Sequence, residues 1–484
     1  MKPSESLIRQ LALLESQARI LEPESSLRDH WMKEVYAYSS QFIDSLEKGP
    51  AFVEPEDGPE PEPFSISDHP VPIEDVLNEF DKQVNTTGLN PASGGHLAYI
   101  PGGGVFPAGL GDLLAAVSNR YAGIYYASPG TVRLENFLIR WMCSLIGYPS
   151  SALGNLTSGG SIANLIAITT ARDRHGIVGD KVPQAVIYLT KQVHHCVQKA
   201  LRIAGLGTAV VRYVPMDNQF RMDAGALEKQ VAADLEAGLS PFLLVGSAGT
   251  TDTGAMDPLD KLADVAGRHD MWFHVDAAYG GFFILLQEMD SLFCGIERSD
   301  SVAIDPHKGL FLPYGLGAVL VKDVEALHRS HFYQAGYLQD VIDEASEPSP
   351  ADLSPELTKH FRGLRLWLPL KLYGLAPFRA ALQEKLLLCR YFYEKIRELG
   401  FETGPEPQLS VMIYRFVPPS AADANAFNAR LVEEVRKDGR VFLSSTTIDG
   451  TFWLRLAVLS FRTHQSTIDM CLKVLKEKIE HLQA

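Results

Sequence analysis

The strongest constraint on the fold is a repeated alternation of short apolar runs with helical stretches between residues 135 and 325. The apolar runs are rich in β-branched residues and span 185–190, 209–214, 242–248, 272–278, 301–304 and 317–321. Such alternation is typical of a mostly parallel sheet joined by crossover helices. Binding sites in these sheets gather at the carboxyl ends of the strands. We therefore expect an α/β fold with its functional residues at strand ends.

Two of these strand ends carry residues suited to chemistry. Lys308 follows the run 301–304 and stands beside His307, and Asp276 ends the core of the run 272–278. A lysine amine can form an imine with a carbonyl cofactor, although most lysines are solvated surface charges. Because parallel strands end at one edge of the sheet, we expect Lys308 and Asp276 to share a site.

A glycine-rich turn adds a third element. Gly159, Gly160 and Ser161 precede the helical stretch 162–168, so free backbone N–H groups and the positive helix end can converge on a phosphate. Many such turns only redirect the chain. Combined with Lys308 and a carboxylate that can pair with a pyridine nitrogen, however, the turn meets the requirements of pyridoxal phosphate.

Composition favours a small-molecule partner. The 484 residues carry a net charge of −15, which argues against nucleic acid or an anionic membrane surface as the main partner. No apolar run reaches the roughly 18 residues of a membrane span, and no signal peptide is evident, so we expect a cytoplasmic protein. The 5 cysteines are scattered without Cys-x-x-Cys spacing, which predicts neither disulfides nor a metal site.

The chain divides into three predicted parts. An apolar stripe in the first 48 residues indicates helices that pack either on the rest of the chain or on another copy of it: Leu27, Trp31, Val35, Tyr38, Phe42 and Leu46. An acidic, proline-rich connector follows at 50–63. Runs at 411–416 and 452–459 and a closing helix predict a small α+β domain. We place an N-terminal helical segment at 1–85, a large cofactor-binding domain at 86–375 and the small C-terminal domain at 376–484.

The order and spacing of several motifs resemble the group II pyridoxal-phosphate decarboxylases, the family of aromatic-L-amino-acid and glutamate decarboxylases. The motifs are His96-Leu-Ala-Tyr-Ile-Pro101, Ala127-Ser-Pro129, Thr157 to Asn164, Gln192-Val-His194, Gly249-Thr-Thr251, His274-Val-Asp-Ala-Ala-Tyr279 and Asp305-Pro-His-Lys308. The similarity runs from about Gly94 to the C-terminus and more weakly through the N-terminal helices. It implies a fold-type I enzyme with a mostly parallel seven-stranded sheet. It also implies a homodimer with active sites at the interface, across which the N-terminal helices dimerise.

The same resemblance implies residue roles. Lys308 would hold pyridoxal phosphate as an aldimine, Asp276 would pair with the ring nitrogen, and Tyr337 would donate the proton to the product. His194 would stack on the ring, with helix capping as its alternative role. The remaining cofactor-binding residues would be Gly159, Gly160, Ser161, Ser247, Ala278, Asp305 and His307. Asp305 replaces the asparagine of animal enzymes, and its charge would repel a phosphate unless it points away or is neutralised.

On the substrate side, the resemblance points to Tyr99, Pro101, Gly102 and Arg455. Gly102 replaces a threonine of mammalian aromatic decarboxylases, which predicts a roomier pocket floor. Arg455 would face the substrate or form a structural ion pair.

The predicted reaction is decarboxylation of an L-amino acid to the amine. An aromatic substrate is favoured by aromatic residues expected near the pocket, which could equally serve core or interface packing: Tyr99, Phe106, Tyr121, Tyr125 and Tyr126. The alternatives are decarboxylation of glutamate, 2,4-diaminobutyrate or a related acid, synthesis of an aromatic aldehyde, and a catalytically silent scaffold. Family members with phenylalanine in place of Tyr337 tend to make aldehydes.

Overall fold

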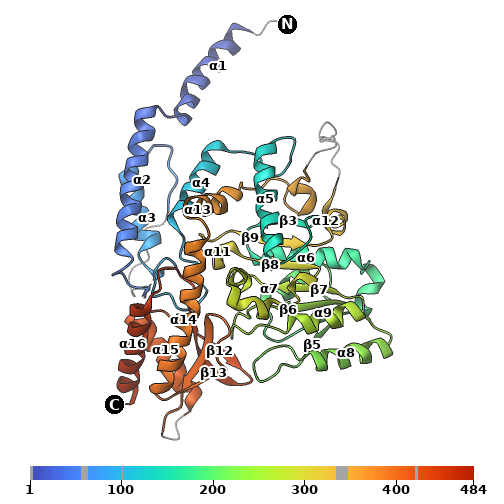
Figure 1. Cartoon of the computed structure of the whole chain (residues 1–484). Coiled ribbons are helices and arrows are strands. Elements are labelled where there is room, and N and C mark those ends of the chain that lie inside the picture. Colours follow the sequence, from blue (N-terminus) through green and yellow to red (C-terminus); the bar gives the residue numbers. More distant parts are fainter. Residues whose placement is uncertain (1–3, 56–63, 101, 334–346, 420–422, 484) are drawn as a thin grey trace.

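The computed structural model describes residues 4–55, 64–100, 102–333, 347–419 and 423–483 (Figure 1). Two residues of the predicted site, Pro101 and Tyr337, lie outside the described residues. The described helices include none that is both long enough and apolar enough to cross a membrane.

A seven-stranded sheet forms the centre of the molecule, in the order β3-β9-β8-β7-β6-β4-β5. Strand β9 runs antiparallel to β3 and β8, and the other neighbours are parallel. The predicted mostly parallel sheet is thus confirmed. Its strands are β3 Leu153–Thr157, β4 Ala185–Leu189, β5 Val210–Tyr213, β6 Ser240–Ser247, β7 Trp272–Asp276, β8 Ser301–Ile304 and β9 Gly317–Val321.

Helices cover the sheet, which explains why the central strands are apolar along their whole length. Every residue of β3, β4, β7, β8 and β9 is buried, as expected for strands covered on both faces. The helices of this layer are α5 Pro129–Leu145, α6 Gly160–Arg174, α7 His195–Ile203, α8 Ala224–Glu236, α9 Leu259–Arg268, α10 Asp290–Phe293, α11 Pro306–Gly309 and α12 Val324–His331. Helix α6 contacts β3, β6, β7, β8 and β9 and therefore spans the middle of the sheet.

The C-terminal part builds a second, antiparallel sheet in the order β10-β11-β13-β12. Its strands are β10 Phe401–Thr403, β11 Val411–Phe416, β12 Ser444–Ile448 and β13 Thr451–Ala457. Three helices pack on it: α14 Ala376–Glu398, α15 Ala424–Asp438 and α16 Gln465–Gln483. A separate apolar core, which includes Phe392, Tyr414 and Leu454, joins these helices to the sheet. The predicted small α+β unit is present, while the exact domain boundaries stay a prediction.

The N-terminal helices extend along one side of the molecule (Figure 1). They are α1 Glu5–Ala18, α2 Ser25–Ser45 and α3 Ile73–Phe80, and the short strand β1 Phe52–Val53, between α2 and α3, pairs with β2 Gly88–Leu89. The predicted apolar stripe is buried only at its end: Leu46 is 5% exposed, whereas Trp31 is 40% and Val35 is 42% exposed. Within one chain, Tyr38 packs on Phe80 of α3, whereas Leu27, Trp31 and Val35 at the start of the stripe stay exposed.

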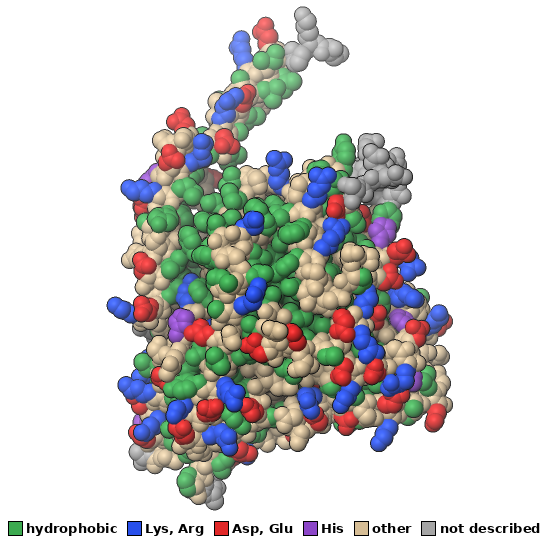
Figure 2. All heavy atoms as spheres, viewed as in Figure 1, with side chains coloured by type: hydrophobic (Ala, Val, Ile, Leu, Met, Phe, Trp, Pro, Cys, Tyr) green, Lys and Arg blue, Asp and Glu red, His purple; other side chains and the backbone are tan. Residues whose placement is uncertain are grey.

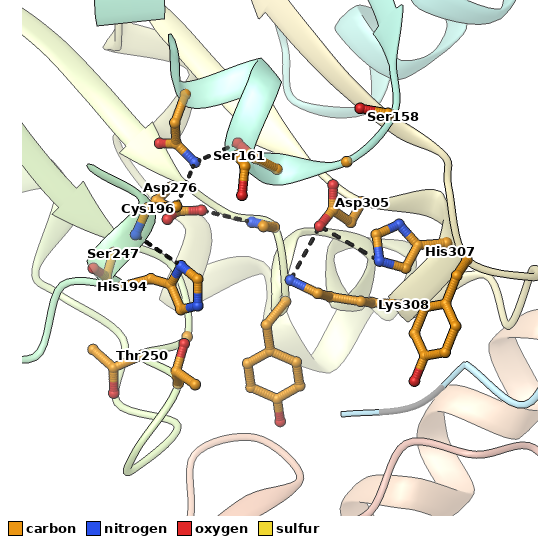
Figure 3. Close-up of a pocket in the computed structure, with 18 of the residues that line it drawn as sticks. Ser158, Ser161, His194, Cys196, Ser247, Thr250, Asp276, Asp305, His307 and Lys308 are labelled. Carbon is orange, nitrogen blue, oxygen red and sulfur yellow. Dashed lines mark hydrogen bonds and ion pairs between the residues drawn. The ribbon is translucent and has the colours of Figure 1, made fainter. Parts of the chain in front are cut away.

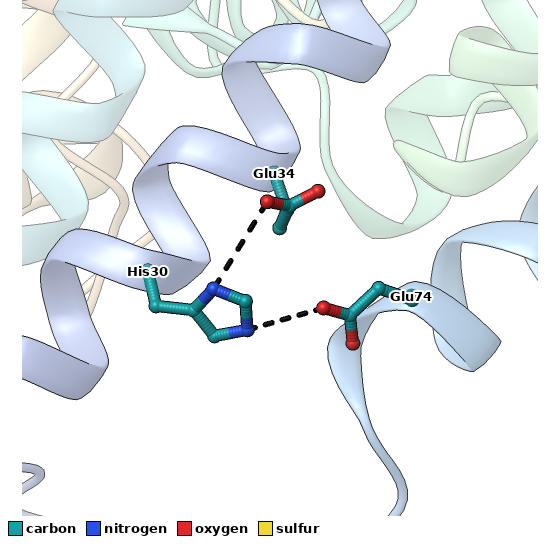
Figure 4. A group of neighbouring side chains, drawn as sticks. All are labelled: His30, Glu34 and Glu74. Atoms are coloured by element: carbon teal, nitrogen blue, oxygen red, sulfur yellow. Dashed lines mark ion pairs between the residues drawn. The ribbon is translucent and has the colours of Figure 1, made fainter.

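A histidine links two of these helices. His30 Nε2 on α2 lies 3.2 Å from Glu74 Oε1 on α3, and its Nδ1 lies 4.0 Å from Glu34 Oε1 (Figure 4). All three side chains reach solvent, so the contribution of this cluster to stability is small.

A hydrophobic area lies beside α2. It covers α4 Phe106–Ser118 and α13 Gly363–Tyr373, which pack against each other (Figure 2). Several large side chains of α4 are exposed there: Phe106, Leu110, Leu113, Leu114 and Val117. Val117 alone is 78% exposed, which is unusual for an apolar helix face that meets only water.

Candidate active site

A cavity of about 410 Å³ opens at the carboxyl ends of β4, β6 and β7 and at the first turn of α6 (Figure 3). Ten predicted cofactor-site residues line it together: Gly159, Gly160, Ser161, His194, Ser247, Asp276, Ala278, Asp305, His307 and Lys308. Strand ends and a helix start thus converge at one edge of the sheet, as the sequence predicts.

Lys308 lies in α11, directly after β8, and points into this cavity (Figure 3). Its Nζ lies 3.0 Å from Asp305 Oδ2. Burial lowers the pKa of Lys308, but the carboxylates of Asp305 and Asp276 outweigh that effect and raise the pKa above its usual value. The Lys308 ammonium thus neutralises Asp305 at this distance, while the position of Asp305 relative to a bound phosphate stays a prediction.

Asp276 ends β7 and is buried at 8% exposure. Its Oδ1 accepts a hydrogen bond of 3.1 Å from the backbone N–H of Ala278. Burial raises the pKa of Asp276, while Lys308 and this N–H act in the opposite direction. A cation placed at this carboxylate would restore its ionised form, which is the role the ring nitrogen of pyridoxal phosphate requires.

His194 has the capping role that the sequence left as an alternative, and its position leaves stacking on the cofactor ring as a prediction. It caps the N-terminus of α7, because its Nδ1 accepts a hydrogen bond of 3.3 Å from the Cys196 N–H, and its ring also lines the cavity. Burial and then the neighbouring His195 and Lys308 lower the pKa of His194 to about 4. The ring is therefore neutral at physiological pH and can stack on a flat cofactor.

The turn before α6 forms an open cradle. Gly159 has φ of +150°, a conformation that side chains disfavour, and none of the described side chains caps this helix. A Cβ added to Gly160 would lie 3.1 Å from both Ala278 Cβ and Asp305 Oδ2, so only glycine leaves the first turn accessible. The N–H groups of this turn can bind a phosphate.

Two further predicted residues support the cradle. His307 Nδ1 lies 2.6 Å from the Leu316 carbonyl, which fixes the imidazole beside Gly159, and burial lowers the pKa of His307. Ser247 donates its backbone N–H to buried Asp257 at 2.8 Å, which holds the end of β6 in place.

The substrate-side predictions fare differently. None of Tyr99, Gly102 and Arg455 lines the cavity. A Cβ at Gly102 would lie 2.1 Å from the His307 carbonyl oxygen, so this backbone leaves no space for a side chain there, and the roomier pocket floor stays a prediction. The backbone next to Lys308 already fills that space. Tyr99 is 55% exposed.

Arg455 has a structural role, although it forms no ion pair with any described residue. Its guanidinium donates to the Thr251 carbonyl at 2.8 Å, the Ala98 carbonyl at 2.7 Å and the Ser444 hydroxyl at 2.9 Å. It therefore ties β13 to a loop of the cavity wall and to the segment that carries Tyr99. Burial lowers its pKa, and Nη2 has no partner among the described residues.

Several cavity residues lie beyond the set of site residues expected from the sequence: Asn164, Gln192, Cys196, Thr250, Tyr279 and Tyr314. Asn164, Gln192, Thr250 and Tyr279 belong to quoted motifs, so their place in those motifs is an available signal. Cys196 and Tyr314 lie in segments without a local pattern that distinguishes a pocket residue from a packed one.

Comparison with known proteins agrees with this site. The conserved domain of pyridoxal-dependent decarboxylases matches residues 55–417. The chain is 33% identical to an aromatic-L-amino-acid decarboxylase of Bacillus atrophaeus, over 79% of this chain and 81% of the relative. The structure of Catharanthus roseus tryptophan decarboxylase in complex with L-tryptophan superposes with a TM-score of 0.87 at 25% identity, covering 94% and 98% of the two chains. That of Oryza sativa tryptophan decarboxylase with pyridoxal phosphate and tryptamine gives 0.88 at 25% identity, covering 96% and 99%.

Proposed function

The chain belongs to the pyridoxal-dependent decarboxylase family, and from that membership we propose that it removes carbon dioxide from an aromatic L-amino acid to leave the amine. One observation carries the proposal: Lys308, Asp276 and the open first turn of α6 line the same cavity. These are an amine for covalent attachment, an anion for a ring nitrogen and N–H donors for a phosphate.

The residues present fit pyridoxal phosphate. Gln192 Oε1 and Asp305 Oδ1 are buried polar atoms without a partner among the described residues, which favours a polar ligand in the cavity. The cradle at Gly160 has no room for a side chain but leaves backbone donors accessible. Lys308 Nζ lies within the same cavity.

The residues around the cavity have distinct roles. Lys308 would hold the cofactor covalently through its Nζ. Asp276 would keep the proton on the ring nitrogen, and neutral His194, at the cavity wall, would face the ring and help to orient the group that leaves. When bound, pyridoxal phosphate supplies the sink for the electrons of the bond broken at the substrate Cα.

We assign the final protonation at Cα to Tyr337, on the strength of its alignment with the family. Because Tyr337 lies outside the described residues, its test is chemical. Tyr337→Phe should lower amine yield and produce aldehyde, ammonia and hydrogen peroxide with consumption of dioxygen. Unchanged amine yield with no peroxide would remove Tyr337 from the mechanism.

An uncharged side chain suits the cavity better than an anionic one. Among its described lining residues, Lys308 is the one permanently cationic group, and the bound cofactor would occupy it. The side-chain carboxylate of glutamate would therefore be buried beside Asp276 and Asp305 without a cationic partner, which costs several kcal/mol (roughly 3–5). Tyr279 and Tyr314 supply aromatic surface.

The test is a product screen. Purified protein is incubated with pyridoxal phosphate and each of L-tryptophan, L-tyrosine, L-phenylalanine, L-glutamate, L-2,4-diaminobutyrate and cysteine sulfinate, and carbon dioxide, amine, aldehyde and peroxide are measured. Carbon dioxide and amine in equal amounts from an aromatic substrate support the proposal, with Lys308→Ala as the inactive control. Turnover of glutamate alone, or peroxide without amine, would overturn it.

We also propose that two copies associate through the hydrophobic area on α4 and α13, with the stripe of α2 packing across. The support is the exposed apolar surface, since faces of this kind mark protein interfaces. Val117→Glu should convert a dimer to a monomer by light scattering, whereas Val178→Glu, at a residue that is 58% exposed outside this area, should not. A wild type that is monomeric and active would contradict this assignment.

A further inference from the structure

A chain of buried hydrogen bonds runs beneath the cavity, from the sheet to the first turn of α6. Trp272 Nε1 donates to Ser301 Oγ at 2.8 Å, and Ser301 Oγ lies 2.8 Å from His274 Nδ1. His274 Nε2 lies 2.8 Å from Asn164 Oδ1. Asn164 Nδ2 then donates to the Gly160 carbonyl at 2.8 Å. All four side chains are buried, at 4% exposure or less.

The chemistry of the two ends fixes the direction of this chain. The Gly160 carbonyl can only accept, so the NH₂ group of Asn164 must face it and Asn164 Oδ1 must face His274. His274 Nε2 therefore carries a proton and donates. At the other end, the Trp272 indole can only donate, so Ser301 Oγ accepts there and its own hydrogen is free for His274 Nδ1.

This direction requires a neutral His274. Burial lowers the pKa of His274 to about 4, so the ring holds one proton near neutral pH, and the chain places that proton on Nε2. With one proton at each link, each hydrogen bond has one donor and one acceptor. A reversed Asn164 amide would place its oxygen against the Gly160 carbonyl and break two links.

The oriented Asn164 amide lies in the same cavity as Asp276, the residue assigned to the nitrogen of the cofactor ring. His274 and Asp276 lie two residues apart on β7 and so share one face of the sheet, which α6 covers. Burial raises the pKa of Asp276, and Asn164 acts against this larger effect to lower it. The Asn164 NH₂ group donates to the Gly160 carbonyl at 2.8 Å, and its Nδ2 lies 3.7 Å from Cys196 Sγ.

We propose that Asn164 is a positioning residue that joins the ring-nitrogen site to the phosphate cradle, and that Trp272, Ser301 and His274 hold its amide in the one productive orientation. The proposal rests on the proposed binding of pyridoxal phosphate. The fixed direction of the buried network then has two consequences for the site. Asn164 opposes the rise that burial causes in the pKa of Asp276, and its hydrogen bond fixes the Gly160 carbonyl in the first turn of α6.

The first experiment compares two buried substitutions on α6. Asn164→Leu removes the amide at similar volume, and Thr170→Val is the matched control. Thr170 is buried on the same helix and donates only to the Ile166 carbonyl of that helix, at 2.8 Å. The dissociation constant of pyridoxal phosphate is measured by fluorescence quenching across pH, together with thermal unfolding.

Asn164→Leu should weaken cofactor binding roughly tenfold at neutral pH, because it removes the hydrogen bond that holds the Gly160 carbonyl of the phosphate cradle. Its loss of affinity on acidification should also begin about one pH unit higher than in the wild type, because Asp276 then takes up a proton more readily. Thr170→Val should leave both quantities unchanged. A purely structural role for Asn164 would change stability without moving the pH midpoint.

A second pair of variants tests the direction of the chain and guards against a misfolded Asn164→Leu protein. His274→Gln keeps an N–H donor for Asn164 Oδ1, whereas His274→Leu has none. We expect near wild-type affinity and pH midpoint for His274→Gln and both defects for His274→Leu. The inference would be overturned if His274→Gln and His274→Leu had the same cofactor affinity and pH midpoint, or if Asn164→Leu matched the wild type in both. Cofactor binding by the wild type would still support the proposed function in that case. A wild type that binds no pyridoxal phosphate would overturn both.

Discussion

The cofactor side and the substrate side of the site differ in how they are built. On the cofactor side, Lys308, Asp276 and Gly160 lie on regular elements of one sheet layer, and buried hydrogen bonds fix them. On the substrate side, Tyr99 is exposed and Gly102 packs against the backbone next to Lys308. Arg455 reaches this region from the other domain. The cofactor-side residues are held in place by regular secondary structure and buried hydrogen bonds. The substrate-side residues come from segments that meet only through tertiary packing.

Lys308→Ala should cause the largest loss of turnover, because Lys308 belongs to the cofactor side of the site. Without the amine, the cofactor has no covalent anchor, so turnover should fall by roughly a thousandfold or more. Carbon dioxide release by equal amounts of wild type and variant measures this. Activity within tenfold of the wild type would mean that the cofactor side lies elsewhere in the molecule.

Asp276→Asn should follow. Loss of the carboxylate charge that would pair with the ring nitrogen should lower the pKa of that nitrogen by about 1–3 units. The protonated fraction of the ring then falls roughly ten- to thousandfold when this pKa drops below the working pH. The rate should therefore fall with little change in KM, because the ring, not the substrate contact, is affected. A selective rise in KM would contradict the assignment.

Gly102→Ala tests most directly whether Gly102 acts in substrate specificity or in packing beside the cofactor side of the site. If Gly102 were a specificity residue, the variant would change substrate preference. The close approach to the His307 carbonyl predicts instead a loss of about 1–3 kcal/mol in the free energy of unfolding through overpacking. Weaker cofactor binding should accompany it, with unchanged ratios of kcat/KM among substrates. Gly109→Ala, where an added Cβ meets nothing within 4 Å, is the control.

A smaller effect concerns pH and stability. The pKa of His274 is about 4 in the folded protein against 6.5 as the ordinary value, so the unfolded chain binds the proton more readily. The stability contribution is complete above pH 6.5 and is lost as the pH falls toward 4. Relative to His274→Gln, the wild type should lose up to roughly 3 kcal/mol over this range, measured by urea unfolding. A constant difference between the two proteins would contradict a buried neutral His274.

The sequence predicts one side of the site far better than the other, and the reason is physical. Parallel strands must end together, so the order of the strands alone predicts that Lys308 after β8 and Asp276 at the end of β7 are neighbours. The seven-stranded sheet and the small α+β unit follow from apolar runs and resemblance. Local pattern cannot show that the space beside Gly102 is filled by the His307 backbone, or that Arg455 bonds Ala98 and Thr251. Those contacts join residues hundreds of positions apart, as the pair Arg455 and Ala98 illustrates.

The buried hydrogen-bond chain from Trp272 to Gly160 also depends on contacts that local sequence patterns do not predict. His274 and Asn164 both lie in motifs read from the sequence, yet their partnership depends on α6 crossing β7. Trp272 and Ser301 look like ordinary strand residues until the register of β7 and β8 places Ser301 opposite His274 and within hydrogen-bond distance of the Trp272 indole. Regular structure can be predicted from periodicity, but the pairing of buried polar groups needs the fold.

The most direct test of the assigned site is to locate the covalent bond to the cofactor. The protein is incubated with pyridoxal phosphate, reduced with borohydride, digested and mapped by mass spectrometry, with Lys308→Ala treated in parallel. We expect stoichiometric labelling of the wild type on Lys308 and none at that peptide in the variant. An unlabelled wild type, or a label on another lysine, would contradict the assignment of Lys308 as the cofactor anchor.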